Sequence, residues 1–361
     1  MQRLHFPFEN LSFFLAKISA IFLQSRASYS IISSMNQHDP PKAPDRRAKP
    51  AEPVAILRIQ VLSAVAALLL IALLFTIVSG ANPKGCRPFG KTLPVAVPSA
   101  LSQANGILSL TVLDVGQGDA LLLQSPSGKT MLVDAGESTA FDTVSNALDA
   151  YGIHRIDTVV ATHPHTDHIG GMAKLLQSYE VGVFYLTEYP STTTQYAEML
   201  RALKENGCSV RLADSDLKLD WDPAVDTDVL FPLSDQAAID ANNHSIVLRV
   251  TYGDVSFLLT GDLEKAGEVM LLAAYDDETL HADVLKVGHH GSDSSTSDAL
   301  LDAVGASIAI VSVGKNNEYG HPHEAVLDRL RAHAVRVYRT DQSGTVVVMT
   351  DGEKTEVITQ Y

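Results

Sequence analysis

The residues of this chain best suited to chemistry lie in one short stretch, where three histidines and an aspartate fall within six positions: His163, His165, Asp167 and His168. Neutral imidazole and carboxylate are ligands that zinc, iron and manganese accept in proteins. The small or β-prone residues Val159 to Thr162 predict a strand that runs straight into this cluster. Pro164 favours extended geometry at His163, and Gly170 and Gly171 permit the turn and the close backbone approach that converging side chains need. The stretch therefore predicts a metal site.

Three other motifs follow apolar segments that we expect to be strands. Thr260-Gly-Asp262 places a carboxylate at a strand end, although Gly-Asp turns are common and the signal is weak alone. The pair His289 and His290, flanked by glycines, is a stronger signal. His321 and His323 precede a proline-started helix and fit a polar loop equally well. The remaining candidates are expected to be surface or capping histidines without a role: His154, His281 and His333.

The elements that must position these residues follow from apolar periodicity and turn residues. Strands are predicted at 108–113, 120–124, 130–133, 159–162, 183–186, 228–231, 245–252, 255–260, 283–288, 307–313, 335–339 and 345–350, the last finishing the chain. Helices are predicted at about 139–151, after Gly171 (Met172, Leu175 and Leu176 share a face), at 193–206, at 263–274, and from Pro322 to about His333. Mixed strands and helices with many hairpins favour an α+β, αββα sandwich, two mixed sheets between helices, over a doubly wound parallel sheet.

Composition supports a packed domain and argues against broad binding of polyanions. The chain has 361 residues, of which 46% are apolar, and its two cysteines (Cys86 and Cys208) form neither a disulfide framework nor a thiolate zinc motif. Residues 106–361 hold 16 Lys+Arg against 38 Asp+Glu, a net charge of −22. Such a surface repels phosphate backbones at long range, so a nucleic-acid substrate must be held locally by metals and a few donors.

The N-terminal part is predicted to be a membrane anchor preceded by a basic tail. Residues 1–53 are expected to be a disordered, basic segment, proline-rich over 36–53, and an apolar run near the start is interrupted by Lys17, so translation from Met35 is an alternative. Residues 54–80 predict a transmembrane helix, because 59–78 are almost wholly apolar and twenty helical residues span roughly 30 Å. Slightly more positive charge before the span than after it favours an N-terminus inside and a catalytic domain outside the cytoplasm. Residues 81–105 are expected to be a linker to the domain at 106–361.

The motifs together resemble a known family. His-x-His-x-Asp-His is the signature of the metallo-β-lactamase fold, and the ordered set resembles the hydrolase domain of the ComEC family of competence and DNA-uptake proteins. The set comprises Asp-Val-Gly-Gln-Gly-Asp (114–119), Val-Asp-Ala-Gly (133–136), the His163 cluster, Asn-Asn-His-Ser (242–245), Thr-Gly-Asp (260–262), His-His-Gly-Ser (289–292) and Tyr-Gly-His-Pro (319–322). The resemblance covers nearly all of 106–361 and is to a stand-alone form with a single anchor.

The resemblance implies metals at the open edge of the sandwich, one or two divalent ions, with Zn²⁺ expected and Mn²⁺ as the alternative. By family pattern, His163 and His165 would bind the first ion and Asp167 and His168 the second. Asp262 would bridge them, and His290 or His289 would complete a shell, with His290 favoured because it directly precedes Gly-Ser. The residues expected to lie behind the ligands and orient them are Asp114, Asp119, Asp134 and Asn243. The sequence departs from the classical pattern where a further histidine ligand is replaced by Asn242 or Asn243, with His244 nearby but shifted, so filling of both positions is left open.

The function implied is hydrolysis of a phosphodiester by a metal-bound hydroxide, which Asp167 would orient. His321 would either protonate the leaving group or bind a phosphate oxygen. Three hypotheses remain: a membrane-anchored phosphodiesterase or nuclease, a phosphodiesterase of cell-wall polymers such as choline-decorated teichoic acid, and a surface binding protein whose metal site has decayed. The expected partners are the membrane and the phosphodiester substrate, and the sequence gives no strong evidence for a protein partner.

Overall fold

The structure is a computed structural model that describes residues 106–215, 217–234 and 239–361. The predicted basic tail, the transmembrane helix at 54–80 and the linker all lie outside the described residues. Among the helices that are described, none combines the length and the apolar character needed to cross a bilayer.

The first sheet has eight strands in the order β14-β13-β1-β2-β3-β4-β5-β6. Their bounds are β1 Leu108–Val112, β2 Leu121–Gln124, β3 Thr130–Val133, β4 Arg155–Ala161, β5 Glu180–Leu186, β6 Ser209–Leu212, β13 Val346–Thr350 and β14 Thr355–Thr359. Pairing is antiparallel from β14 to β3 and parallel from β3 to β6. The sheet is therefore mixed, as the alternation of hairpins and helices in the sequence predicts.

The second sheet has six strands in the order β12-β11-β10-β9-β8-β7. Their bounds are β7 Asp226–Phe231, β8 Val247–Tyr252, β9 Val255–Leu259, β10 Val284–Lys286, β11 Ile308–Val311 and β12 Arg336–Arg339. The strands β7, β8 and β9 are antiparallel neighbours, whereas β9 to β12 are parallel.

Side chains alternate between two buried environments along each strand, which explains how the sheets form a sandwich. Leu121 and Leu123 of β2 belong to the apolar core between the sheets, whereas Leu122 packs in the core on the outer side of the first sheet. In β9, Phe257 joins the central core and Leu258 the core outside the second sheet. Because successive residues of a strand point to opposite faces, both faces of each sheet are apolar and both must be covered.

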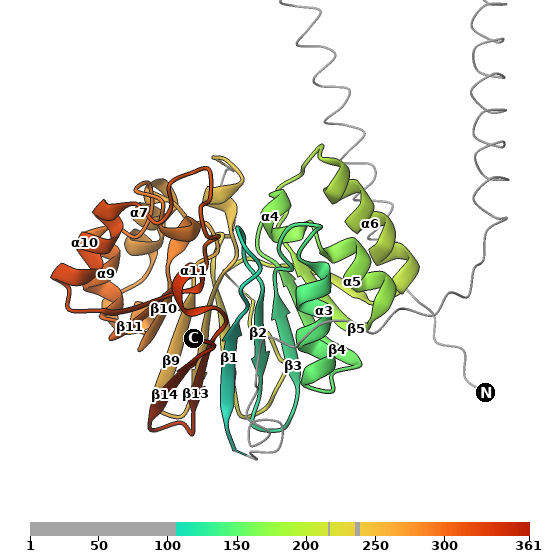
Figure 1. The fold of residues 1–361 in the computed structure, drawn as a ribbon, viewed down its shortest axis with the longest axis horizontal. Helices are drawn as coiled ribbons and strands as arrows, with labels where there is room; N and C mark the ends of the chain where they lie inside the picture. Colours follow the sequence, from blue (N-terminus) through green and yellow to red (C-terminus); the bar gives the residue numbers. More distant parts are fainter. Residues whose placement is uncertain (1–105, 216, 235–238) are drawn as a thin grey trace, which may run out of the picture. The chain divides into compact units, whose positions relative to one another are not determined.

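Helices cover the two outer faces (Figure 1). The first sheet is covered by α3 Phe141–Ala150, α4 Thr166–Ile169, α5 Met172–Ser178 and α6 Thr194–Asn206. The second is covered by α7 Lys265–Ala274, α8 Asp277–Leu280, α9 Asp298–Val304 and α10 Glu324–Ala332. Short helical turns are η2 Asn242–His244, η3 Gly288–Gly291 and α11 Thr340–Ser343. The αββα sandwich is thus confirmed for the described residues.

Local signals set several helix ends where the sequence predicts them. The Thr193 side chain accepts a hydrogen bond from the Tyr196 backbone N–H at the start of α6, and Gly207 ends the helix with φ +76°. A threonine N-cap contributes about 1 kcal/mol, and glycine adopts the left-handed C-terminal conformation without a Cβ penalty. The three predicted helix residues after Gly171, Met172, Leu175 and Leu176, form the buried face of α5.

Several elements differ from the sequence-based expectation, including the short helical segments α4, α11, η2 and η3, which were not predicted. The strand at 345–350 is not the last, because β14 follows it and pairs with β13. The strand β6, at the edge of the first sheet, is exposed at all four positions and so lacks the apolar alternation by which strands are recognised. The helices α8 and α9 are short and were not predicted, although the Ser297 cap and Gly305, with φ +62°, mark the ends of α9.

Candidate metal centre

The chemical motifs meet because the strands that carry them end at the same edge of the sandwich. In the first sheet β3 and β4 are parallel, so Asp134 after β3 and His163 after β4 emerge together. In the second sheet β9 and β10 are parallel, so Asp262 and the His289–His290 pair also emerge together. Parallel strands place their carboxyl ends side by side, which is the usual position of sites in such sheets.

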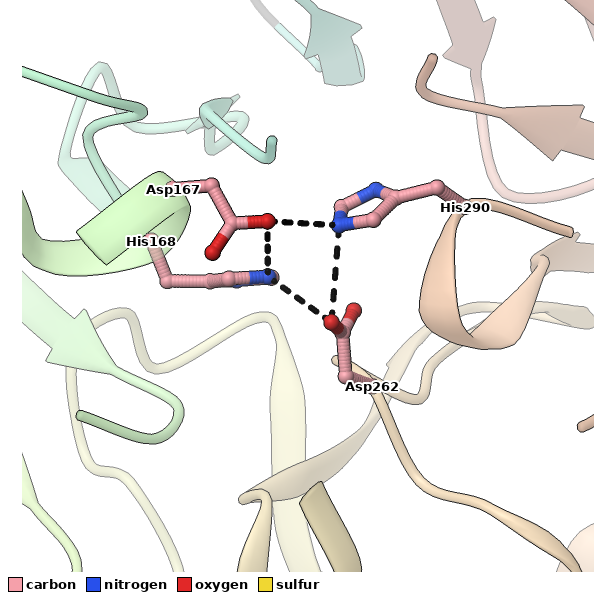
Figure 2. Close-up of side chains that lie close together, drawn as sticks. All are labelled: Asp167, His168, Asp262 and His290. Carbon is pink, nitrogen blue, oxygen red and sulfur yellow. Dashed lines mark ion pairs between the residues drawn. The ribbon is translucent and has the colours of Figure 1, made fainter. Parts of the chain in front are cut away.

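Four side chains from both sheets converge on one point, and we call them the four-residue cluster: Asp167, His168, Asp262 and His290 (Figure 2). Asp262 Oδ2 lies 3.1 Å from His168 Nε2 and 3.4 Å from His290 Nε2. Asp167 Oδ2 lies 3.3 Å from His290 Nε2 and 3.9 Å from His168 Nε2. All but Asp167 are almost completely buried.

The spacing and the unsatisfied atoms of the cluster fit a divalent ion. Four donors at about 2.1 Å from a tetrahedral ion stand about 3.4 Å from one another, which is close to the four separations above. The Nε2 atoms of His168 and His290 and Oδ1 of Asp262 are buried and make no well-formed hydrogen bond within the described protein. Buried polar atoms in native proteins almost always have a partner, and imidazole with carboxylate is a donor set suited to zinc or manganese.

The far nitrogens of both imidazoles are held by protein acceptors. His168 Nδ1 lies 2.7 Å from Asp134 Oδ2, and His290 Nδ1 lies 3.0 Å from the Ser312 carbonyl oxygen. Asp134 is itself fixed, because it accepts hydrogen bonds from the Thr162 backbone N–H (2.8 Å) and hydroxyl (2.6 Å). A proton on each Nδ1 leaves the lone pair of each Nε2 directed into the cluster, which is the arrangement found behind metal-bound histidines.

Comparison with known proteins agrees with this geometry. The profile of the Metallo-beta-lactamase superfamily matches residues 113–315, which contain the whole cluster. The chain belongs to this superfamily. It is 34% identical over 259 residues to ComE operon protein 3 of Bacillus subtilis, covering 65% of this chain and 32% of that protein. It is also 34% identical over 265 residues to Competence protein ComA of Neisseria gonorrhoeae, covering 73% of this chain and 35% of that protein.

These relatives confirm the resemblance to the ComEC family that the ordered motifs indicated. The chain spans only about a third of the length of the curated relatives it matches. Among solved structures, the metallo-β-lactamase-fold protein YhfI of Bacillus subtilis is 14% identical, with a TM-score of 0.43, and the match covers 66% of this chain and 98% of that one.

With its two histidines neutral, the four-residue cluster would carry an excess of negative charge. Burial lowers the pKa of His168, but the carboxylates of Asp262, Asp134 and Asp167 outweigh burial and raise it well above its ordinary value. Burial raises the pKa of Asp262, but His168 and His290 outweigh it and hold that pKa well below its ordinary value. A cation among these carboxylates would take over the stabilising role that protonated histidines otherwise fill.

The two other histidines of the metallo-β-lactamase signature form what we call the histidine pair, His163 and His165. His163 Nε2 lies 3.0 Å from His165 Nδ1 and 3.8 Å from Asp262 Oδ2, and His165 is exposed. Burial and the neighbouring His168 lower the pKa of His163 well below its ordinary value, so this ring is neutral and able to coordinate. The histidine pair lies at the edge of the four-residue cluster. Within the described part of the chain, Asp262 is the carboxylate recorded within 4.0 Å of the pair.

The asparagines expected at the position of the classical third histidine have other hydrogen-bond partners. The Asn243 side chain accepts a hydrogen bond from the Gly267 backbone N–H (2.7 Å) and donates to Asp240 (2.9 Å), which fastens η2 to α7. Asn242 Nδ2 lies 3.3 Å from Glu264 Oε1. His244 is buried beside Tyr189, with ring centroids 5.7 Å apart, and burial lowers its pKa.

His289 and His321 line the rim of the centre. His289 Nε2 lies 3.8 Å from Asp262 Oδ2, while its Nδ1 lies 2.8 Å from Glu264 Oε1. The His321 ring is 5.5 Å from that of His289 and is stacked on the exposed Tyr319. Burial, together with the charges of His289, His290 and His323, lowers the pKa of His321 to about 4. His290 and not His289 therefore belongs to the four-residue cluster.

Of the remaining predicted residues, Asp119 lies beside the four-residue cluster and Asp114 lies in the turn between β1 and β2. Asp119 is buried next to His290, with Oδ1 3.5 Å from His290 Nδ1. Asp114 accepts a hydrogen bond from the Gly116 backbone N–H (3.3 Å), which shapes the turn between β1 and β2. Gly118, with φ +115°, lies against the Asp167 carbonyl, where any Cβ would collide. Gly170 and Gly171 serve close backbone approach, to Ser138 and Ala135, and not a left-handed turn, since neither has a positive φ.

Two residues that contact the site were missed at the sequence level, Glu264 and Lys286. Glu264 accepts from Ser294 (2.9 Å) as well as facing His289. Lys286 is fully buried and its Nζ lies 2.8 Å from Asp119 Oδ2. A charged residue inside the apolar run Val284-Leu-Lys-Val287 was the signal that could have identified Lys286, because buried lysines are rare unless paired.

Proposed function

We propose that this chain is a metal-dependent hydrolase that cleaves phosphodiester bonds. The observation that carries the proposal is the four-residue cluster, in which two oriented imidazoles and two carboxylates from separate motifs share one point. A divalent ion there would supply Lewis acidity toward a phosphoryl oxygen and a water of lowered pKa. Zn²⁺ is the expected ion and Mn²⁺ the alternative, because both accept imidazole and carboxylate.

The chain's own residues have distinct roles in this proposal. Asp167 is the one member of the four-residue cluster open to solvent, with 24% of its side chain exposed. In this proposal it accepts a hydrogen bond from the attacking water and orients it. His321, which its lowered pKa keeps neutral at pH 7, donates a hydrogen bond to a substrate oxygen and does not deliver a proton as an imidazolium. His289, held by Glu264 on one nitrogen, directs the other toward the same edge.

The substrate class rests on chemistry and on the names of the relatives. Those names refer to competence and recombination, processes that handle DNA. Residues 106–361 carry 16 basic against 38 acidic side chains, which disfavours an extended footprint on a phosphate backbone. We therefore favour a short stretch of single-stranded nucleic acid held at the centre, and the same charge argument keeps a cell-wall phosphodiester as the second candidate.

Membrane anchoring through residues 54–80, with the catalytic domain outside the cytoplasm, is part of the same proposal. Its support is the apolar run at 59–78, long enough to cross a bilayer, and the slight excess of positive residues before it. Fractionation of cells expressing the full chain tests this directly. Recovery in the membrane fraction, with the 106–361 domain open to protease added outside spheroplasts, is expected, and recovery in the soluble fraction contradicts it.

The activity test uses the purified full chain, stripped with a chelator and reloaded with Zn²⁺ or Mn²⁺. We expect metal-dependent hydrolysis of bis-p-nitrophenyl phosphate, lost in Asp167→Ala and His168→Ala and kept in Asp222→Asn. Asp222 is a matched control because it is buried and hydrogen-bonded to Ser125 (2.7 Å), at the end of β2 that points away from the site. Single-stranded DNA and phosphocholine esters then separate the two substrate classes. Bound metal without hydrolysis of any of these would favour a binding protein.

A further inference from the structure

Lys286, the last residue of β10, is the one lysine among the buried polar side chains of the described residues. Its Nζ donates a hydrogen bond to the Val287 carbonyl oxygen (2.9 Å) and lies 2.8 Å from Asp119 Oδ2, itself 1% exposed. An isolated charge at such depth is costly, and each partner offsets the other only while both are present. The contact of 2.8 Å with the Lys286 ammonium favours the ionised form of the Asp119 carboxylate.

The other side of Asp119 faces the imidazoles of the four-residue cluster. Its Oδ1 lies 3.5 Å from His290 Nδ1. Carboxylate oxygens of Asp119 and Asp134 and a ring nitrogen of His168 also lie within 4.8 Å of one another. Asp119 therefore stands behind His290, on the side away from the Nε2 atom that approaches Asp262. Asp119, Asp134 and His168 carry donor atoms of the kind that bind a cation, and the Lys286 ammonium already supplies positive charge beside Asp119.

Main-chain hydrogen bonds tie this pair to the rest of the centre. The Asp119 backbone N–H donates to the Asp167 carbonyl oxygen (3.2 Å). The Ser312 hydroxyl donates to the Gly118 carbonyl oxygen (2.7 Å), and the Ser312 carbonyl accepts from His290 Nδ1 (3.0 Å). A shift of Asp119 would thus be transmitted to Asp167 and to His290, two of the four cluster residues.

We propose that Lys286 and Asp119 form a built-in charge pair that positions the metal-facing histidines, with Asp119 orienting His290 and Lys286 holding Asp119 in place. The pair adds a carboxylate behind the imidazoles without adding net negative charge to the buried cluster. Both are positioning residues, since neither reaches the point where the Nε2 atoms meet. The inference rests on the metal centre of the proposed function and is independent of the substrate.

Two variants of the full chain separate positioning from structural support. Asp119→Asn removes the carboxylate and leaves Lys286 unpaired, so we expect the affinity for Zn²⁺ or Mn²⁺ to fall by about 10–100-fold, the range seen when such outer partners are lost. The melting temperature of the metal-free protein should fall as well. In Asp119→Asn combined with Lys286→Met no unpaired charge remains, so the melting temperature should recover toward wild type while the metal affinity stays low.

Affinity is measured by chelator competition, and Asp222→Asn, a buried carboxylate remote from the centre, serves as the control with unchanged affinity. Nitrogen-15 NMR of the metal-free protein gives a readout without metal: the His290 Nδ1–H, which faces the Ser312 carbonyl oxygen, should exchange with water faster in the double variant than in wild type, because the Asp119 carboxylate no longer holds the ring. Recovery of both melting temperature and affinity in the double variant, or unchanged affinity in Asp119→Asn, overturns the inference. If wild type binds no divalent ion, the proposed function fails instead, and an unchanged exchange rate of the His290 Nδ1–H in the double variant would overturn the inference separately.

Discussion

The four-residue cluster and the histidine pair lie side by side but differ in how the protein supports them. In the cluster, His168 and His290 are buried, and Asp134 and Ser312 hold their far nitrogens. In the pair, His163 has the Thr162 hydroxyl 3.1 Å from its Nδ1, whereas His165 is exposed. The asparagines expected at the place of a third histidine are engaged with Asp240, Glu264 and Gly267. From this comparison we expect one strong metal position and a second, weaker one.

The largest effect is expected from Asp262→Asn, because Asp262 faces both groups. This nearly isosteric change removes the carboxylate 3.1 Å from His168 and 3.8 Å from His163. Hydrolysis of bis-p-nitrophenyl phosphate should fall by about 10³-fold or more, since metal-based stabilisation of several kcal/mol is lost. Bound metal, measured by plasma mass spectrometry, should fall below one ion per chain. A variant that keeps its metal and its rate would show that Asp262 joins neither site.

The second-largest effect is a difference in metal affinity between a variant of the four-residue cluster and a variant of the histidine pair. His168→Ala should weaken the tightest metal binding by about 100-fold or more, exceeding the effect of losing an outer partner. His165→Ala should leave one tightly bound ion and change its affinity by less than about 10-fold, because an exposed and weakly supported ligand adds little. Isothermal titration of both variants measures this. Equal losses would mean that the two groups act as one coupled site.

A smaller difference in metal affinity is expected between variants of His289 and His290, the adjacent histidines after β10. His290→Ala should lower metal affinity by at least the 10–100-fold seen when an outer partner is lost, because its Nε2 lies between Asp167 and Asp262. His289→Ala should alter metal affinity little and act mainly on the turnover rate, since His289 sits at the rim with Glu264. Cobalt substitution provides the measurement, because the visible absorption of bound Co²⁺ changes when a ligand is lost. The reverse order of effects would exchange the roles of the two residues.

The smallest effect concerns stability against pH and His321. Burial and the charges of His289, His290 and His323 lower the pKa of His321 to about 4 in the folded protein. A lowered folded-state pKa contributes stability above the unfolded value of about 6.5, and this is lost as pH falls toward 4. His321→Gln should therefore flatten the loss of unfolding free energy between pH 6.5 and 4 in the metal-free protein, by less than about 2 kcal/mol because the ring is partly exposed. Denaturant titrations at several pH values measure it, and identical slopes in both proteins would contradict it.

The sequence predicted the site better where residue types alone indicate a metal ligand than where tertiary contacts determine which side chain takes part. The strands that end at the motifs and the sandwich could be predicted from apolar periodicity, whereas the convergence of the separate motifs was implied by the resemblance to the family. The choice between His289 and His290 could only be weighted, since both adopt left-handed backbone, with φ of +46° and +53°, and only the fold shows which ring turns inward.

The Lys286–Asp119 pair could not be predicted from local pattern, because its members lie on β10 and in the turn before β2, in different sheets. Sequence periodicity reports which face of a strand is apolar, not which partner lies opposite. The same limit explains β6, whose four residues are exposed and carry no apolar alternation. Asn243 was expected behind the metal ligands, which stays a prediction, and its hydrogen bond from Gly267 fastens η2 to α7, a contact that depends on tertiary packing.

The central claim is that Asp167, His168, Asp262 and His290 share one divalent ion, and anomalous X-ray diffraction from crystals of the metal-loaded chain tests it most directly. The account predicts a strong peak about 2.0–2.2 Å from the Nε2 atoms of His168 and His290 and from a carboxylate oxygen of Asp262. A second, weaker peak beside His163 and His165 would agree with the comparison of the two groups. Metal peaks confined to surface carboxylates, with none among these four side chains, would contradict the claim.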